Sequence, residues 1–155
     1  MSYTAYEAMR KNAFTTPATY AEYADGMGRR ALRSYLTYGY IPVEDSVKEA
    51  YHRQEQTSRT LEYAYDDFVL AQVAQLLGHT ADYDTLMLRS ESFRHVIDPS
   101  TGYANGRHAD GHFLSGSHPY TFASYITEGA PCHYTWYVPH NPDNGQTYGL
   151  AFAAF

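Results

Sequence analysis

The sequence has a single cysteine, Cys132, and few basic residues. One cysteine excludes an intrachain disulfide and a cysteine-rich metal site. The 11 lysines and arginines stand against 17 aspartates and glutamates, which gives a formal net charge of −6, and the basic residues are scattered along the chain. Nucleic acids and anionic membrane surfaces attract clustered positive charge, so neither is expected as a partner.

Long hydrophobic runs are also missing. No stretch approaches the roughly 20 apolar residues that a membrane-spanning helix needs, so no membrane span is expected. The opening residues, M-S-Y-T-A-Y-E, lack the charged-then-apolar pattern of a secretory signal. That start does not assign a compartment.

Tyrosine is abundant, with 17 copies among 155 residues. A chain of this length is expected to form about one domain. Tyrosine combines a large apolar face with a polar tip, which suits both a protein core and a wet binding surface. Both uses stay open for these residues.

The first half of the chain has the pattern of helices. Residues 5–14 form a short amphipathic segment that ends at T-T-P, and a second segment runs from residue 18 to Gly39, a glycine that suits a helix end. The string G-Y-I-P-V-E-D that follows is expected to be an extended loop fixed by Pro42.

The clearest helix is expected to begin near Thr57 or Ser58, either of which can cap it, and to end at Gly78. A further helix over 82–97 should pack against it as an antiparallel αα-hairpin. The first of the two has apolar residues at the three- and four-residue spacing of one buried stripe. These residues are Leu61, Tyr65, Phe68, Val69, Val73 and Leu76.

Residues 98–117 are dominated by Gly, Asn, Asp and Ser, which predicts a long loop or a pair of turns. The string H-A-D-G-H within it places His108 and His112 four residues apart. On a helix this spacing could hold zinc. Gly106 and Gly111 argue against a helix here, and so against a zinc site.

Glu128 is a lone carboxylate in the most aromatic part of the chain, near Trp136, the only tryptophan. A short helix is expected just after it, from Pro131 to a point before Pro139. The simplest interpretation is that Glu128 complements the dipole of this helix. Alternatively, the aromatic rings desolvate the carboxyl, raise its pKa and suit it to general acid catalysis. Desolvation outweighs the dipole if Glu128 is buried.

Three more carboxylates gather in the string E-Y-A-Y-D-D. Glu62 and Asp66 are four residues apart and share a helix face, and Asp67 lies beside them. They could form a solvated acidic face paired with Arg59. The alternative is an acidic wall that hydrogen-bonds sugar hydroxyls or braces a catalytic residue.

Several strings, taken in order, resemble glycoside hydrolase family 92. They are S-R-T-L-E-Y-A-Y-D-D-F at 58–68, D-P-S-T-G-Y at 98–103, R-H-A-D-G at 107–111 and T-E-G-A-P-C-H-Y-T-W-Y-V-P-H at 127–140. G-Y-I-P at 39–42 fits as well. The resemblance covers nearly the whole chain.

The resemblance implies a calcium-dependent, exo-acting α-mannosidase that inverts the anomeric configuration, with a mannose-containing glycan as its substrate. The implied fold is all-α, part of an (α/α)6 toroid, with antiparallel helical hairpins and a long Gly- and Asp-rich loop. The glutamate of the family's T-E-G motif is the general acid, and here it is Glu128. His133, Trp136, Asp66 and Asp67 are then expected to bind the sugar.

The sequence also departs from the family pattern. Residues 1–155 are expected to be one segment of the catalytic domain, without the N-terminal β-sandwich and the C-terminal part of the toroid. The family motifs G-N-E-P and G-N-D-D, which supply calcium ligands and the base, do not occur, so calcium is implied by the family alone and no metal ligand is expected here. Asn141 replaces an aspartate of the usual motif, and Cys132 replaces a common aromatic.

These departures leave other functions open. Turnover by this chain on its own is not expected, and the family suggests a secreted or periplasmic location. The alternative is a non-catalytic helical module that binds glycans or another subunit. A partial toroid would also leave apolar helix faces uncovered, through which the chain could self-associate.

Overall fold

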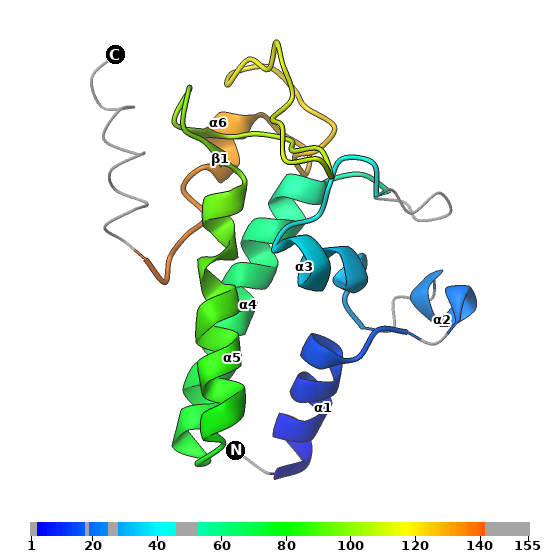
Figure 1. Ribbon diagram of the computed structural model, residues 1–155, viewed down its shortest axis with the longest axis vertical. Coiled ribbons are helices and arrows are strands. Elements are labelled where there is room, and N and C mark those ends of the chain that lie inside the picture. The colour runs from blue at the N-terminus through cyan, green and yellow to red at the C-terminus, as the bar shows by residue number, and fades with distance from the viewer. Residues whose placement is uncertain (1–2, 18, 25–27, 46–52, 142–155) are drawn as a thin grey trace.

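The computed structural model describes residues 3–17, 19–24, 28–45 and 53–141, which are mainly helical (Figure 1). The helices are α1 (Tyr3–Phe14), α2 (Tyr20–Ala24), α3 (Leu32–Tyr38), α4 (Gln56–Leu76), α5 (Thr80–Ser90), the 3-10 helix η1 (Glu91–His95) and α6 (Pro131–Tyr134). Two short strands, β1 (Ile97–Asp98) and β2 (Tyr103–Ala104), lie between η1 and α6. The predicted helical fold is confirmed. None of the described helices is long and apolar enough to cross a membrane.

The centre of the molecule is the hairpin of α4 and α5, which lie side by side (Figure 1). This confirms the predicted αα-hairpin. The stripe predicted for α4 is wrong in part, because Val69 is 43% exposed and Leu76 is 86% exposed. Ala64, Ala71 and Ala74 are fully buried instead. Small side chains let neighbouring helices approach closely, so alanines carry part of the buried face that larger residues were expected to fill.

Helix α1 packs against this hairpin through a buried tyrosine and a charged pair. The Tyr6 hydroxyl donates a hydrogen bond of 2.6 Å to Asp82 at the start of α5. Arg10 donates to both oxygens of Asp82, at 2.6 and 3.1 Å. The Arg10 guanidinium lowers the pKa of Asp82, while burial and the bond to Asp82 raise the pKa of Tyr6 to about 12. These contacts fix α1 across the hairpin.

The single helix expected from residue 18 to Gly39 is instead two helices, α2 and α3, and part of that segment lies outside the described residues. Gly28 and Ala31 have left-handed backbone, with φ of 81° and 55°, which a continuous right-handed helix does not permit. The predicted end is confirmed. Gly39 has φ 74°, and its N–H donates to the carbonyl of Tyr35.

Helix α4 begins without the side-chain cap predicted at Thr57 or Ser58. The N–H groups of both residues point to the carbonyl of Tyr125, at 3.1 and 3.4 Å. The Thr57 hydroxyl donates to the carbonyl of Asn105, and the Ser58 hydroxyl accepts a bond from the N–H of Thr127. A loop distant in the sequence therefore caps the helix.

The segment after η1 gathers at the end of the hairpin where α4 begins (Figure 1). Strands β1 and β2 are antiparallel, with Ile97 opposite Ala104, and the chain then continues in turns as predicted for this region. Helix α6 begins at Pro131 and ends before Pro139, which confirms the predicted short helix. This end of the molecule carries the T-E-G string.

Candidate functional site

Glu128 lies on a loop that the N-terminal end of α4 holds in place. The N–H of Glu55 donates to the carbonyl of Ser124 at 2.9 Å. The N–H of Thr127 donates to the Ser58 hydroxyl oxygen at 2.8 Å. The longest helix of the described structure therefore fixes the backbone on the N-terminal side of Glu128.

The other side of Glu128 is also fixed. Ala123 donates its N–H to the carbonyl of Gly129 at 3.1 Å, and the N–H of Ala130 donates to Nδ1 of His133 at 3.1 Å. A Cβ at Gly129 would lie 2.8 Å from Nδ1 of His133, so a larger residue here would displace this histidine ring. Glu128 itself has φ 48°, a left-handed conformation that few residues with side chains adopt.

The side chain of Glu128 is exposed to solvent. The prediction that aromatic rings bury it is therefore wrong for this structure. The aromatic stretch divides its rings between two places: Tyr125 is 7% exposed and belongs to the core, whereas Trp136 is 48% exposed. The indole N–H of Trp136 donates to the carbonyl of Cys132, which ties the ring to α6. The alternative role for Glu128, complementing the dipole of α6, stays a prediction.

An acidic surface lies along α4, where the side chains of Glu62 and Asp66 are exposed. Partial desolvation raises the pKa of both carboxyls, although 57% of the Asp66 side chain is exposed. The charge of Asp66 adds to this effect on Glu62. Burial raises the pKa of Tyr137, and the charges of both carboxylates add to that shift, so Tyr137 lies near them.

The ring of Tyr137 also contacts α4 directly. It meets the ring of Tyr65 edge to face, with a centroid distance of 6.1 Å. His140 stacks on Tyr65 and Phe68 at 5.9 and 5.4 Å, and its Nε2 lies 2.8 Å from the carbonyl of Ser90. These contacts hold the chain after α6 against the acidic surface, and sequence reasoning missed them. The signal was the aromatic content of T-W-Y-V-P-H, where Tyr137 and His140 are three residues apart.

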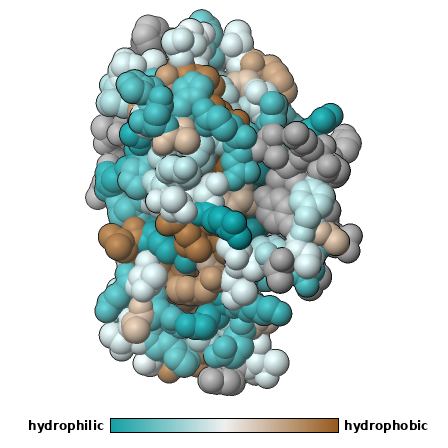
Figure 2. Space-filling view, turned by 45° about the vertical axis from the view of Figure 1, so that its right-hand side comes forward, coloured by the Kyte–Doolittle hydropathy of each residue, from teal (hydrophilic) through white to brown (hydrophobic). Residues whose placement is uncertain are grey.

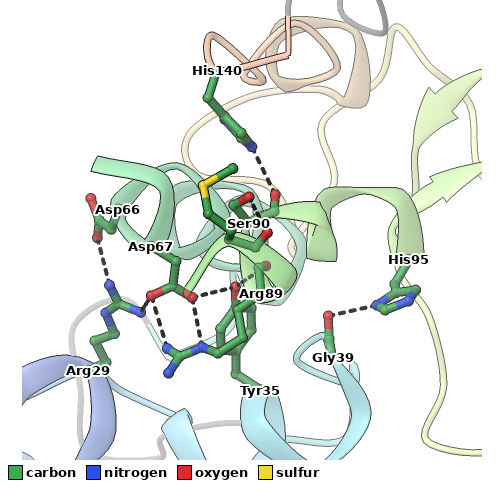
Figure 3. Close-up of polar contacts among 10 residues, drawn as sticks. Arg29, Tyr35, Gly39, Asp66, Asp67, Arg89, Ser90, His95 and His140 are labelled. Carbon is green, nitrogen blue, oxygen red and sulfur yellow. Dashed lines mark hydrogen bonds and ion pairs between the residues drawn. The ribbon is translucent and has the colours of Figure 1, made fainter. Parts of the chain in front are cut away.

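Asp67 is fully buried and lies in an ion-pair cluster (Figure 3). Its Oδ1 accepts hydrogen bonds from Arg29 at 2.5 Å and Arg89 at 2.9 Å. Its Oδ2 accepts from Arg89 at 2.9 Å and from the Tyr35 hydroxyl at 3.1 Å. Arg29 also lies 3.9 Å from Asp66, so it connects the buried and the exposed carboxylate.

The five residues predicted for the site are thus in three settings. His133, like Glu128, is exposed, and Trp136 is half exposed; all three lie on or beside the T-E-G loop. Asp66 is on the acidic surface, and Asp67 is inside the protein with both oxygens engaged. Sugar contact by these residues stays a prediction.

Arg59 was expected to pair with the acidic face of α4. It lies 3.9 Å from Glu55, and its charge lowers the pKa of Glu62 against the effect of burial.

The histidines of H-A-D-G-H lie in separate pairs rather than in one metal site. Nδ1 of His108 is 2.5 Å from Glu44, and Nδ1 of His112 is 3.2 Å from Asp110. Across the described ranges, no three His, Cys, Asp or Glu side chains converge as metal ligands. These residues therefore do not fit the calcium ion that the family resemblance implies.

Comparison with known proteins finds a matching family and similar solved structures. The model of the glycosyl hydrolase family 92 catalytic domain matches residues 1–144. The family GH92 alpha-mannosidase BT3965 from Bacteroides thetaiotaomicron is 32% identical over 97% of this chain and 19% of its own, with a TM-score of 0.75. Its complex with mannoimidazole gives 31% identity over the same shares and a TM-score of 0.76.

A second enzyme has a similar structure. The family GH92 inverting mannosidase BT2199 from Bacteroides thetaiotaomicron VPI-5482 is 28% identical over 93% of this chain and 18% of its own, with a TM-score of 0.78. The chain thus spans about a fifth of the length of these enzymes. No curated protein matches it.

Proposed function

The chain belongs to glycosyl hydrolase family 92, and from this membership we propose that it forms part of the catalytic domain of an α-mannosidase. The observation that carries the proposal is the family match over residues 1–144, together with 32% identity to an alpha-mannosidase over 97% of the chain. The substrate class is the α-mannosidic bonds of glycans. The helices are then a portion of the family's (α/α)6 toroid.

Glu128 is the proton donor in this proposal, because it is the glutamate of the T-E-G string. Hydrogen bonds on both sides of it fix the backbone, which supports a side chain held at one position. A general acid must reach the leaving oxygen and carry its proton near neutral pH. The exposed carboxyl is open to a substrate.

The acidic surface of α4 binds sugar hydroxyls in this proposal. Asp66 is exposed, and Tyr137 lies beside it with a ring face suited to a sugar. Asp67 acts through Arg29, which lies between the two carboxylates. Asp67 is thus a positioning residue. His133 and Trp136 bind from the T-E-G side.

We propose that hydrolysis inverts the anomeric configuration, as the name of BT2199 states for that enzyme. An inverting glycosidase has a second carboxylate about 6.5–9.5 Å from the acid, which leaves room for a water molecule. We assign no described carboxylate to this role. No step is assigned to calcium, because the described residues offer it no set of ligands.

The proposal is tested with an α-linked mannobiose and the full-length protein that carries this chain. We expect mannose to be released, with the β anomer appearing first in proton NMR spectra recorded before mutarotation. The matched α-linked glucose disaccharide should stay intact. Failure to release mannose would refute the mannosidase, and α-mannose as the first product would refute inversion.

Glycan binding without turnover is the second candidate, and the exposure of Glu128 favours it. Trp136 is the only tryptophan and is half exposed, so its fluorescence reports on sugar binding beside α6. A fluorescence change with mannobiose and no mannose release would favour the binding module. Release of mannose would exclude it.

A further inference from the structure

Residues 104–106, the A-N-G segment, follow the string D-P-S-T-G-Y and are buried. Ala104 is 1% exposed and Asn105 is 3% exposed. Asparagine is mostly found at the surface, and a buried asparagine needs hydrogen-bond partners for its polar atoms. The proposed function gives this segment no role, so its contacts are the place to look for one.

The side chain of Asn105 is hydrogen-bonded at both of its polar atoms. Nδ2 donates to Oδ2 of Asp98 at 2.9 Å and to the carbonyl of Leu114 at 3.0 Å. Oδ1 accepts a bond from the hydroxyl of Ser117 at 2.7 Å. The backbone N–H donates to the carbonyl of Val96 at 2.8 Å. These bonds reach β1 and the turn that contains Ser117, and together they fix the backbone at position 105.

The fixed backbone bonds to both helices that flank the T-E-G loop. The carbonyl of Asn105 accepts a bond from the Thr57 hydroxyl at 3.1 Å, and the N–H of Thr57 points to the carbonyl of Tyr125 at 3.1 Å. The N–H of Ala104 donates to the hydroxyl of Thr135, the residue after α6, at 2.9 Å. The A-N-G segment therefore connects the start of α4, before the loop, to the end of α6, after it.

Gly106 brings the same segment against the loop by packing. A Cβ at this position would lie 2.5 Å from Leu114 and 2.8 Å from Val43. It would also lie 3.1 Å from the ring of Tyr125, three residues before Glu128. The backbone at Gly106 thus lies directly against the side chain of Tyr125, which is 7% exposed.

We propose that Asn105 is a positioning residue for the reaction: it fixes the A-N-G segment between α4 and α6, and the segment keeps the T-E-G loop where Glu128 can reach the leaving oxygen. In this proposal Asn105 does not touch the substrate. The inference rests on the proposed mannosidase function and adds to it a residue outside the T-E-G string. A displacement of a reacting group by about 1 Å can lower a rate by about 100-fold, so such support affects catalysis.

The test compares two substrates of the full-length protein. Mannobiose has a leaving oxygen that needs a proton, whereas the leaving oxygen of dinitrophenyl α-mannoside needs none. Asn105→Ala should lower kcat on mannobiose by about 10- to 100-fold, through displacement of the acid, and change kcat on the activated substrate by less than about twofold. A merely structural role would lower both activities by the same factor.

A second pair of variants acts on the bond between the A-N-G segment and α4. Thr57→Val keeps the shape of the side chain and removes the hydroxyl that donates to Asn105, so it should cause a smaller loss of the same kind. Thr57→Ser keeps a hydroxyl and should restore activity on mannobiose. If Asn105→Ala does not fold, these two variants decide the question.

Tyr6→Phe is the matched control. It removes the hydrogen bond to Asp82 at the start of α5, the opposite end of the hairpin from the T-E-G loop. It should lower the melting temperature without changing the ratio of the two activities. The same ratio in Asn105→Ala or Thr57→Val as in wild type would overturn the proposal.

Amide hydrogen exchange separates this inference from the mannosidase proposal. If the wild-type protein releases mannose from neither substrate, the mannosidase proposal fails by itself. Exchange at Thr127 and Ala130, on either side of Glu128, then tests the positioning. Faster exchange at both amides in Thr57→Val than in wild type would support it, and equal exchange would refute it.

Discussion

Two adjacent aspartates of α4 differ in the burial of their side chains by more than any sequence pattern indicates. Asp66 has 57% of its side chain exposed and lies 3.9 Å from Arg29. Asp67 is fully buried and accepts hydrogen bonds from Arg29, Arg89 and Tyr35 (Figure 3). A buried carboxylate between two guanidinium groups holds distant parts of the chain together, whereas its exposed neighbour is available to a ligand.

Replacing Asp67 should therefore damage stability, while replacing Asp66 should damage binding. Asp67→Asn leaves Arg89 buried without its counter-charge and leaves Arg29 only its longer contact of 3.9 Å with Asp66, and we expect the free energy of unfolding to fall by about 3–5 kcal/mol. Asp66→Asn should change it by less than about 1 kcal/mol, because its ion pair is long and exposed. Urea denaturation of both variants measures this. Equal effects would contradict the division of roles.

At the scale of elements, the loop of Glu128 and the start of α4 depend on one another. The Ser58 hydroxyl accepts the N–H of Thr127, while N–H groups at the start of α4 donate to the Tyr125 carbonyl. The loop thus caps the helix, and the helix fixes the loop. This reciprocal contact links the stability of α4 to the position of the proposed acid.

Ser58→Ala should loosen this contact. The N–H of Thr127 would lose its partner, at a cost of about 1–3 kcal/mol if it stays buried. We expect faster amide hydrogen exchange at Thr127 and a lower kcat on mannobiose. Thr85→Ala is the matched control, since its exposed hydroxyl bonds only within α5, to the carbonyl of Ala81. Unchanged exchange at Thr127 in Ser58→Ala would argue against the anchor.

The attachment of α1 to α5 should depend on pH. Arg10 lowers the folded-state pKa of Asp82 below the ordinary 3.8, so the ionised form stabilises the fold. That contribution is present above the unfolded-state pKa and is lost as the pH falls through the folded-state value. We expect Asp82→Asn to lower the free energy of unfolding by about 1 kcal/mol at neutral pH. At a pH below the folded-state pKa of Asp82 the substitution should have almost no effect. A cost that is constant with pH would contradict this.

The elements that sequence predicted best are those with local signals. Gly39 ends α3 because glycine tolerates a left-handed backbone, and Pro131 begins α6 because its ring fixes φ near the helical value. The cap of α4 was missed because it comes from Tyr125, which only the folded chain brings near. The exposure of Glu128 was missed for the same reason: composition shows that rings are close in sequence, but not which way they point.

At the scale of the whole molecule, apolar residues stay exposed on the hairpin. Val69 and Leu76 are seven residues apart on α4, so they share a face, and Leu88 on α5 is 78% exposed. Figure 2 shows hydrophobic patches among hydrophilic side chains on one side of the molecule. Such patches usually find a partner.

We therefore expect the 155 residues expressed alone to self-associate. Replacing Val69 and Leu76 together by lysine should shift the chain toward the monomer, because charge on this face opposes burial. Light scattering after size-exclusion chromatography measures the mass of the wild-type chain and of the double variant. A monomeric wild-type chain at high concentration would contradict the prediction.

The proposed function requires Glu128 to be the proton donor, and the dependence of the rate on the leaving group tests this directly. In the full-length protein, Glu128→Gln should lower kcat on mannobiose by about 10²–10⁴-fold, the worth of general acid catalysis. Its activity on dinitrophenyl α-mannoside should fall far less, because that leaving oxygen needs no proton. Glu7→Gln on α1 should resemble wild type on both substrates. An equal loss on the two substrates, or no loss on mannobiose, would contradict the assignment.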